Sequence, residues 1–390
     1  MNMRSRGAIL IVGASLAATG HTSWAGSEHE FSKDGHSYKY VWRQYLDAQI
    51  VRPRPGREVR VLALRSGLLQ QKASNQFLDL RKVVGLWQAT FDPEGRIAQN
   101  EMVLDLTTRL LEQHKLVLVP PATLNARMMS ACPDALGQIH VFVALPVWND
   151  KSDFQNRLFY LREKQNNWKE LITGPQSSFF PYLTAFSAGD SVQVYYLQNV
   201  KDPDPPLLMH SLPVNRPMDD KPWRLFTSPG PYPIRACDFT AFASAKDLIV
   251  VFREKGSTAL SLARWPENRR SWDVRKNVFS PRIGGALVGE ALTGLSGLAT
   301  ADGVIHVFAT LHFNDQRQIL HLSAGREDSW SGGVILNQSA DWLSAALDAQ
   351  GRIHLIGVNE KGAVWYALGN TRDSWSFKGI LLDENTKQTR

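Results

Sequence analysis

The sequence of 390 residues lacks the features that mark several common classes of protein. Its two cysteines, Cys132 and Cys237, are too few for a small scaffold held together by disulfides. It has no run of five or more lysines and arginines, so no nucleic-acid partner is expected. Beyond the N-terminal segment no apolar run is long enough for a transmembrane helix, because Glu290, Asp302 and several glycines interrupt the closest candidate, 283–308.

The composition is that of a folded protein with a sizeable core. Hydrophobic residues make up 43% of the chain and charged residues 21%, which excludes wholesale disorder. Lysine and arginine number 44 against 37 acidic residues, and a formal charge of +7 gives only a weak attraction to acidic surfaces. The length fits two or three domains, or one long all-β domain.

Residues 1–25 have the three regions of a secretory signal peptide. Arg4 and Arg6 precede an apolar stretch from Gly7 to about Thr19, and the segment ends in the small-x-small sequence 23–25. The alternative is an N-terminal membrane anchor, but spanning a bilayer takes about 20 apolar residues. The sequence therefore predicts cleavage between Ala25 and Gly26, a secreted or periplasmic protein, and no stable membrane span after cleavage.

The two cysteines leave two alternatives open. In an oxidising compartment Cys132 and Cys237 could form a disulfide. They could equally be two buried thiols, because the sequence does not show whether they approach each other.

Internal repetition governs the rest of the chain. The clearest copies centre on an Ile-His pair, in 137–142, 302–308 and 351–356. Weaker copies extend the series, so that the Ile or Val at the anchor position falls at 59, 97, 139, 192, 249, 305 and 353. Each unit reads as four short strands joined by turns, without a sustained helical period. Four strands per unit of this length predict a propeller blade.

The predicted fold is a single all-β propeller of four-stranded antiparallel blades over 36–383. The anchors favour seven blades, with six possible. Residues 36–51 form either an extra edge strand or part of the first blade. Segments 26–35 and 384–390 are expected to be a flexible N-terminal tail and a C-terminal tail.

Several units end in a polar segment that leads to a tryptophan, in 326–330, 371–375, 269–272 and 165–168, and in three of these, all but 269–272, an Asp or Asn stands shortly before the tryptophan. These endings resemble the Asp-box hairpin of sialidase-like (BNR) β-propellers, although the leading serine and the glycine between Asp and Trp of that motif are missing. The resemblance implies the propeller fold and says nothing of activity, because these boxes lie away from the ligand face in that family. It also predicts that Trp330 and Trp375 occupy equivalent buried positions.

The repeated histidines are weak candidates for a metal site. His140, His306 and His354 occupy equivalent positions of different units, so they cannot converge on one ion. We expect packing histidines whose ring nitrogens are hydrogen-bonded. The sequence also lacks zinc-ligand spacing and nucleotide-binding loops, so we predict no metal and no cofactor.

Loops that precede innermost strands open on one face of a propeller, so residues there are the candidate ligand contacts. Guanidinium groups bind carboxylates, and flat aromatic rings stack on sugars. The candidates for ligand binding are Arg127, Arg235, Arg282, Trp87, Tyr182 and Trp342. A sialidase-like reaction would also need a nucleophile and acids, for which the candidates are Tyr232, Glu290 and Asp341. The alternative is that the arginines are ordinary loop charges.

These patterns favour an exported, soluble, monomeric propeller that binds a glycan or an extracytoplasmic protein through one face and catalyses nothing. The alternative from another class is a sialidase-like glycoside hydrolase that acts on an acidic glycan, with the arginine cluster holding the ligand's carboxylate. A third hypothesis is a periplasmic assembly scaffold.

Overall fold

The structure is a computed structural model that describes most of the chain from Glu30 to Asp383. Residues 1–29 and 384–390 lie outside the described residues, and with them the predicted signal peptide and C-terminal tail. Further gaps in the description are 34–35, 52–57, 72–76, 108–109, 111–116, 119–126, 135, 149–153, 164–171, 174–178, 189–190, 199–206, 214–235, 245–246, 255, 267–270, 284–285, 288–291, 314–315, 326–328 and 371–373. In the described part no helix is long and apolar enough to cross a membrane.

The first half of the chain forms three antiparallel sheets. The first contains β1 (Glu30–Lys33), β2 (His36–Val51), β3 (Val59–Gln71), β4 (Phe77–Phe91) and β5 (Ile97–Asp105). The second contains β6 (Val117–Leu118), β7 (Met129–Pro133), β8 (Ile139–Trp148), β9 (Phe154–Arg162) and β10 (Ile172–Thr173). The third contains β11 (Phe179–Ala188), β12 (Ser191–Gln198) and β13 (Leu207–Pro213).

The second half forms three more sheets, each with four strands in chain order. They are β14 (Asp238–Ser244), β15 (Asp247–Arg253), β16 (Leu260–Pro266) and β17 (Asp273–Phe279); β20 (Leu292–Ala299), β21 (Ile305–Phe313), β22 (Gln316–Ala324) and β23 (Trp330–Leu336); and β24 (Trp342–Leu347), β25 (Arg352–Val358), β26 (Val364–Asn370) and β27 (Trp375–Leu382). A small hairpin, β18 (Arg282–Ile283) and β19 (Ala286–Leu287), separates the fourth sheet from the fifth.

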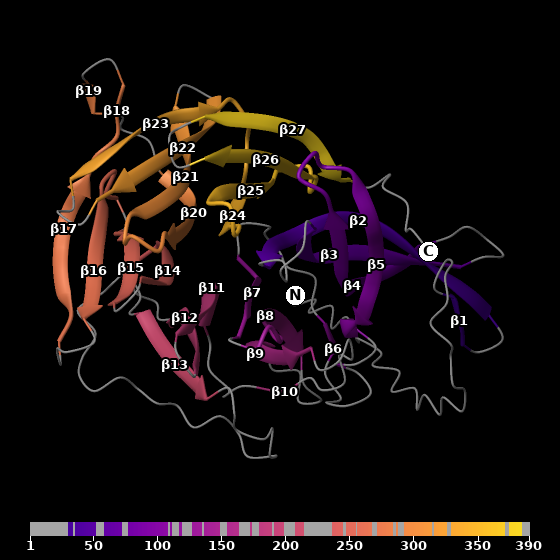
Figure 1. Ribbon diagram of the computed structural model, residues 1–390. Coiled ribbons are helices and arrows are strands. Elements are labelled where there is room, and N and C mark those ends of the chain that lie inside the picture. Colours follow the sequence, from indigo (N-terminus) through magenta and orange to yellow (C-terminus); the bar gives the residue numbers. More distant parts are fainter. Residues whose placement is uncertain are drawn as a thin grey trace, which may run out of the picture.

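The six larger sheets are the blades of a propeller, and we number them blade 1 to blade 6 in chain order (Figure 1). Their innermost strands, β2, β7, β11, β14, β20 and β24, contact one another in that order, and β24 contacts β2 to close the ring. The all-β propeller predicted from the repeats is therefore confirmed.

The described residues contain six blades where the anchor spacing favoured seven. The anchors at Val59 and Ile97 begin β3 and β5, which belong to the same sheet, so they do not mark separate blades. Residues 36–51 supply the innermost strand of that sheet. The expected flexible tail is partly ordered as well, because β1 pairs with the start of β2.

The repeated Ile-His pair is explained by a buried chain of polar groups. In blade 2, His140 Nε2 lies 3.2 Å from Asp134 Oδ2 and its Nδ1 lies 2.7 Å from the Tyr160 hydroxyl. In blade 6, His354 makes the same two contacts with an aspartate and a tyrosine. The expectation of packing histidines with hydrogen-bonded ring nitrogens is confirmed at both positions.

The same aspartates build the turns that precede these strands. Asp134 Oδ1 accepts hydrogen bonds from the backbone N–H groups of residues 136 and 138, and Asp348 repeats the arrangement. Each turn ends in a glycine with a left-handed backbone, Gly137 at φ 74° and Gly351 at φ 75°. Glycine suits these positions because a Cβ disfavours positive φ. The Asp-x-x-Gly turn and the histidine six residues after the aspartate are thus one unit.

Neighbouring blades are tied by a repeated hydrogen bond between their innermost strands. A side-chain oxygen of one strand accepts from a backbone N–H of the next blade at five of the six junctions. The pairs are Asp47 with Met129, Ser130 with Ala185, Asp238 with Gly294, Ser296 with Ala345, and Ser344 with Ile50. At the remaining junction, between blades 3 and 4, the buried hydroxyl of Thr184 has no hydrogen-bond partner among the residues that the structure describes. Small polar residues on innermost strands therefore join the blades.

This difference between junctions predicts opposite effects for two similar substitutions. Ser130→Ala leaves the buried N–H of Ala185 without an acceptor and is expected to lower the free energy of unfolding by about 1–3 kcal/mol. Thr184→Val removes a buried hydroxyl that makes no hydrogen bond, so the protein should be as stable as before or more stable. Urea denaturation of both variants measures this, and equal losses would contradict the assignment of the bond at the blade 2–blade 3 junction.

The tryptophans of the Asp-box-like endings are equivalent but less buried than expected. Trp330 and Trp375 each begin the outermost strand of their blade, β23 and β27, which confirms the alignment of the repeats. Both side chains are only partly buried, because an outermost strand has a neighbouring strand on one side only. Among the described tryptophans, the fully buried ones are Trp87 and Trp365, on the third strands of blades 1 and 6.

The two cysteines are thiols in this structure. Cys132 lies in β7 of blade 2, and Cys237 precedes β14 of blade 4. No disulfide joins these two residues, because blade 3 stands between them in the ring.

Candidate functional site

The candidate ligand face is defined by the strand order. In a four-stranded meander, the loop before the innermost strand and the turn between the second and third strands lie at the same end of the blade. We call this end face A. Its described residues include Asp341, which precedes β24, Arg317 at the start of β22, and Glu360 between β25 and β26.

Arg127, one of the predicted ligand residues, is instead a buried link at the centre of the ring. It lies just before β7 with 5% of its surface exposed. Its guanidinium donates hydrogen bonds to the backbone oxygens of Leu295 (2.8 Å) and Leu343 (3.1 Å), in blades 5 and 6. It also donates to Gln49 Oε1 in blade 1 at 3.3 Å. One side chain of blade 2 therefore holds three other blades.

Two buried carboxylates balance the charge of Arg127. Burial raises the pKa of Asp47 to about 6, and the positive charge of Arg127 opposes that rise. Burial likewise raises the pKa of Asp238 to about 6, against the charges of Arg253 and Arg127. Arg127 is thus hydrogen-bonded and neutralised within the protein, which gives it a structural part in the ring.

These carboxylates predict a dependence of stability on pH. The pKa of Asp47 is higher in the folded protein than its ordinary value of about 3.9, so the folded state keeps a proton that the unfolded chain loses between about pH 4 and pH 6. Its contribution to stability is therefore greatest below pH 4 and falls by about 2–3 kcal/mol as the pH rises to 6. In Asp47→Asn this part of the fall should be absent, as measured by urea denaturation across that range. An unchanged pH profile would contradict the raised pKa.

The other predicted ligand residues do not form a described cluster. Trp87 and Trp342 are 2% and 4% exposed and so present no ring for stacking. Trp87 instead packs under the Arg65 guanidinium, whose carbon lies 4.9 Å from the ring centre. Tyr182 lies in β11 and Arg282 in β18, where the side chains are outside the description. Tyr232, Arg235 and Glu290 lie outside the described residues, so the catalytic trio and the ligand contacts of Arg235 and Arg282 stay predictions.

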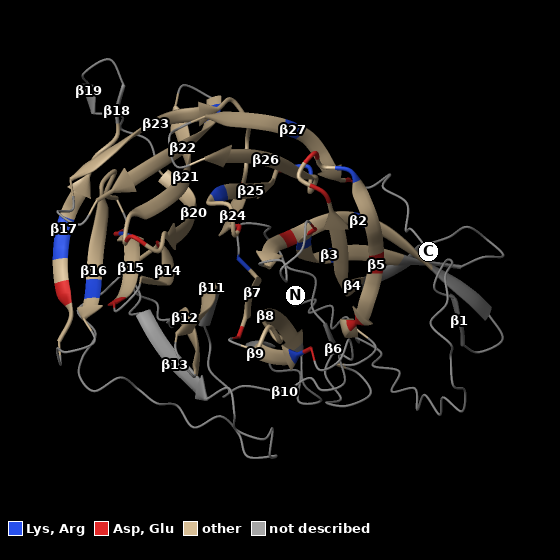
Figure 2. Cartoon of the chain, in the orientation of Figure 1, with Lys and Arg blue, Asp and Glu red and all other residues tan. Residues whose placement is uncertain are grey.

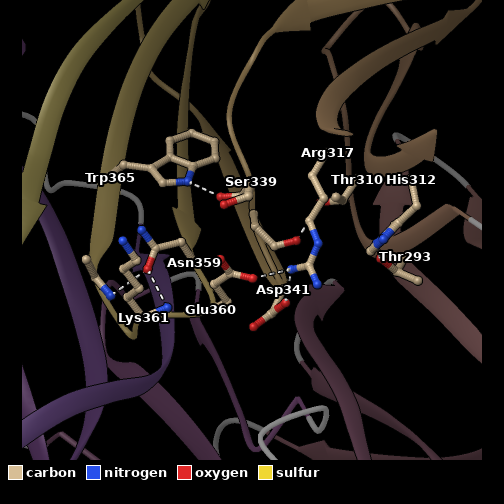
Figure 3. A network of polar contacts seen from close by, with 12 residues as sticks. Thr293, Thr310, His312, Arg317, Ser339, Asp341, Asn359, Glu360, Lys361 and Trp365 are labelled. Carbon is tan, nitrogen blue, oxygen red and sulfur yellow. Dashed lines mark hydrogen bonds and ion pairs between the residues drawn. The ribbon is translucent and has the colours of Figure 1, made fainter. Parts of the chain in front are cut away.

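Face A carries a polar network at the junction of blades 5 and 6, shown in Figure 3. Arg317 Nη1 lies 2.8 Å from Asp341 Oδ1 and 3.8 Å from Glu360 Oε2. The side chains are 30%, 20% and 61% exposed, so the network is open to solvent. Beside it, Thr293 Oγ1 and His312 Nε2 share a hydrogen bond of 2.8 Å.

The network combines hydrogen-bond donors with acceptors, and one of the acceptors, Asp341, has a raised pKa. Partial burial raises the pKa of Asp341, and the Arg317 charge acts against that rise. Asp341 was predicted from its place before an innermost strand. Arg317 was missed because it lies at the start of a third strand and not before an innermost strand. The one sequence signal for it is its position after the turn between the second and third strands, which lies on face A.

No protein-family model and no curated protein sequence matches the chain. Solved structures do. A mutant of the Aleuria aurantia lectin in complex with Fucα1-6GlcNAc matches with a TM-score of 0.50 at 13% identity, over 89% of this chain and 99% of that one. The lectin SapL1 in complex with α-methyl fucoside matches with a TM-score of 0.50 at 15% identity, over 87% and 98%. A neuraminidase-like protein from A/bat/Guatemala matches with a TM-score of 0.46 at 11% identity. At these identities the likeness of the two lectins shows the fold, and this chain has the β-propeller fold.

Proposed function

We propose that the chain is an exported, soluble, monomeric propeller that binds a glycan through face A without catalysis. The observation that carries the proposal is the solvent-open network of Arg317, Asp341 and Glu360. A sugar hydroxyl donates one hydrogen bond and accepts others, so neighbouring hydroxyls are bound by a guanidinium and a carboxylate placed side by side. The fold is consistent with this use, since two structures that share it are lectins solved with fucose-containing ligands.

A sialidase-like hydrolase is the second candidate. The raised pKa of Asp341 favours it, because a general acid must hold its proton near neutral pH. Against it, Arg317 is paired with two carboxylates of the chain and does not offer its charge to a carboxylate of the substrate. Incubation with a fluorogenic sialoside separates the two, and turnover that Asp341→Asn abolishes would replace binding by hydrolysis as the function.

Export is part of the proposal and has its own test. The support is the arrangement of residues 1–25, with Arg4 and Arg6 before the apolar stretch and a small-x-small end at Ala25. The full chain is to be expressed and the cytoplasm separated from the exported fraction. Intact mass and N-terminal sequencing should find protein that begins at Gly26 outside the cytoplasm.

The main prediction is that Arg317→Met removes glycan binding. The substitution takes away the donor that Asp341 and Glu360 surround, so affinity for the best glycan of an array should fall at least about tenfold. The matched control is Arg275→Met, which removes another arginine paired with a carboxylate, Asp273 at 3.4 Å. That pair lies on the outermost strand β17, where Figure 2 shows basic and acidic positions close together.

Binding is to be measured on a glycan array and then by calorimetry, with melting temperatures as a check of folding. The control should bind as the unsubstituted protein does. The proposal fails if that protein binds no glycan, or if Arg317→Met binds as well as the control does.

A further inference from the structure

The network on face A also indicates which glycans it takes, an inference that rests on the proposed function. We propose that the site selects glycans that carry no carboxylate or sulfate and rejects their acidic counterparts. The observation is that one guanidinium nitrogen, Arg317 Nη1, already lies within 4 Å of two carboxylates, Asp341 and Glu360.

An acidic ligand would therefore meet acceptors where it needs donors. A carboxylate or sulfate accepts hydrogen bonds only, and each acidic oxygen of Asp341 and Glu360 is an acceptor as well. To reach Arg317, an acidic ligand would have to displace the carboxylate of either Asp341 or Glu360. It would then lie in contact with the carboxylate that remains, and two negative charges in contact repel each other. A neutral hydroxyl has no such conflict, because it donates to a carboxylate and accepts from the guanidinium.

Three other described cations of this face have partners within the chain or lie away from the Arg317 guanidinium. Arg127, at the centre of the ring, is buried and hydrogen-bonded within the protein, and its charge acts against the raised pKa values of Asp47 and Asp238. Arg253, at the end of β15, donates to the Ser257 carbonyl and lies close enough to Asp238 to lower its pKa. Lys361 follows Glu360 in the turn, and Figure 3 places it beside Asn359, away from the Arg317 guanidinium.

The pairing of arginines with acids of the chain distinguishes this site from an anion-binding site. An anion-binding site needs guanidinium groups whose donors point at the ligand. In face A, Arg317 is instead paired with two acids of the chain, and the charge of Arg127 acts on the pKa values of two buried aspartates. The remaining donors of Arg317, the acceptors of Glu360, which is 61% exposed, and the pair of Thr293 with His312 are groups that hydrogen-bond hydroxyls.

The test compares neutral glycans with the same glycans bearing one acidic group. The probes are N-acetyllactosamine and a fucosylated trisaccharide, each beside its sialylated and its 6-sulfated form, on one array at physiological salt. The protein is the mature full chain, and the variants are Glu360→Gln and Asp341→Asn. Lys361→Gln is the matched control, because it changes a charge in the same turn outside the network.

Each neutral glycan bound should be preferred at least about tenfold over its acidic forms. Glu360→Gln and Asp341→Asn should narrow that preference by raising affinity for the acidic forms, and Lys361→Gln should leave it or widen it. Equal binding of neutral and acidic members by the unsubstituted protein overturns the inference while the proposed function stands. An unchanged preference in both acid-to-amide variants also overturns it, and an array without any binding instead refutes the proposed function.

Discussion

Replacing Arg127 by methionine is expected to lower the free energy of unfolding by about 3–5 kcal/mol. Methionine fills much of the volume but removes the positive charge that acts on the buried Asp47, and it leaves the buried Asp238 with Arg253 alone of its two positive neighbours. It also leaves the backbone oxygens of Leu295 and Leu343 without their donor. An uncompensated buried charge is costly because the protein interior solvates it poorly.

The pH dependence of this loss distinguishes charge from packing. At pH 5 the two aspartates, with pKa values raised to about 6, are largely protonated in the folded protein and need less compensation. The loss caused by Arg127→Met should therefore be smaller at pH 5 than at pH 8, as urea denaturation at both values measures. Arg264→Met, which removes a partly exposed arginine 3.6 Å from Asp247, is the control and should cost about 1 kcal/mol or less at either pH. A loss for Arg127→Met of the same size at both pH values would mean that packing, not charge, holds the ring centre.

The fold could be predicted from the sequence because each blade repeats the same local chemistry. The clearest case is an Asp-x-x-Gly turn followed by Ile-His, which occurs in blade 2 at 134–140 and in blade 6 at 348–354, where the aspartate bonds both the turn and the histidine. The number of blades was harder to predict, because strands of one sheet share that chemistry. Val59 and Ile97 both begin strands after polar stretches of the sequence, and only the pairing of β3 and β5 with β4 shows that the two strands belong to one sheet.

The site was predicted less well, because a position in a blade does not fix where a side chain points. Arg127 and Asp341 both precede innermost strands, yet Arg127 turns into the ring centre and Asp341 stays partly exposed on face A. The difference lies in partners far apart in the sequence: Gln49 and Leu343 for Arg127, and Arg317 for Asp341. A local pattern cannot show such partners, and for the same reason it could not show that Arg317 belongs to the site.

The second large effect is expected at Trp365, in the core of blade 6. This side chain is fully buried in β26, packs with Phe308, Leu343 and Leu355, and donates a hydrogen bond of 2.8 Å to the Ser339 carbonyl. The neighbouring strand carries Gly357 opposite it, where any Cβ would overlap the indole ring. The tryptophan thus occupies space that the chain leaves free for it.

Trp365→Ala should lower the free energy of unfolding by about 3–5 kcal/mol, because it removes a large buried ring and the backbone on either side cannot close the cavity. The matched control is Phe377→Ala, whose ring centre lies 6.3 Å from that of Trp365 but whose side chain is 40% exposed, and it should cost about 1 kcal/mol or less. Urea denaturation of both variants gives the comparison. Since Trp365 in β26 donates a hydrogen bond to Ser339 of the loop that carries Asp341, Trp365→Ala should also weaken glycan binding, while Phe377→Ala should not. Equal stability losses in the two variants would contradict the packing assigned to blade 6.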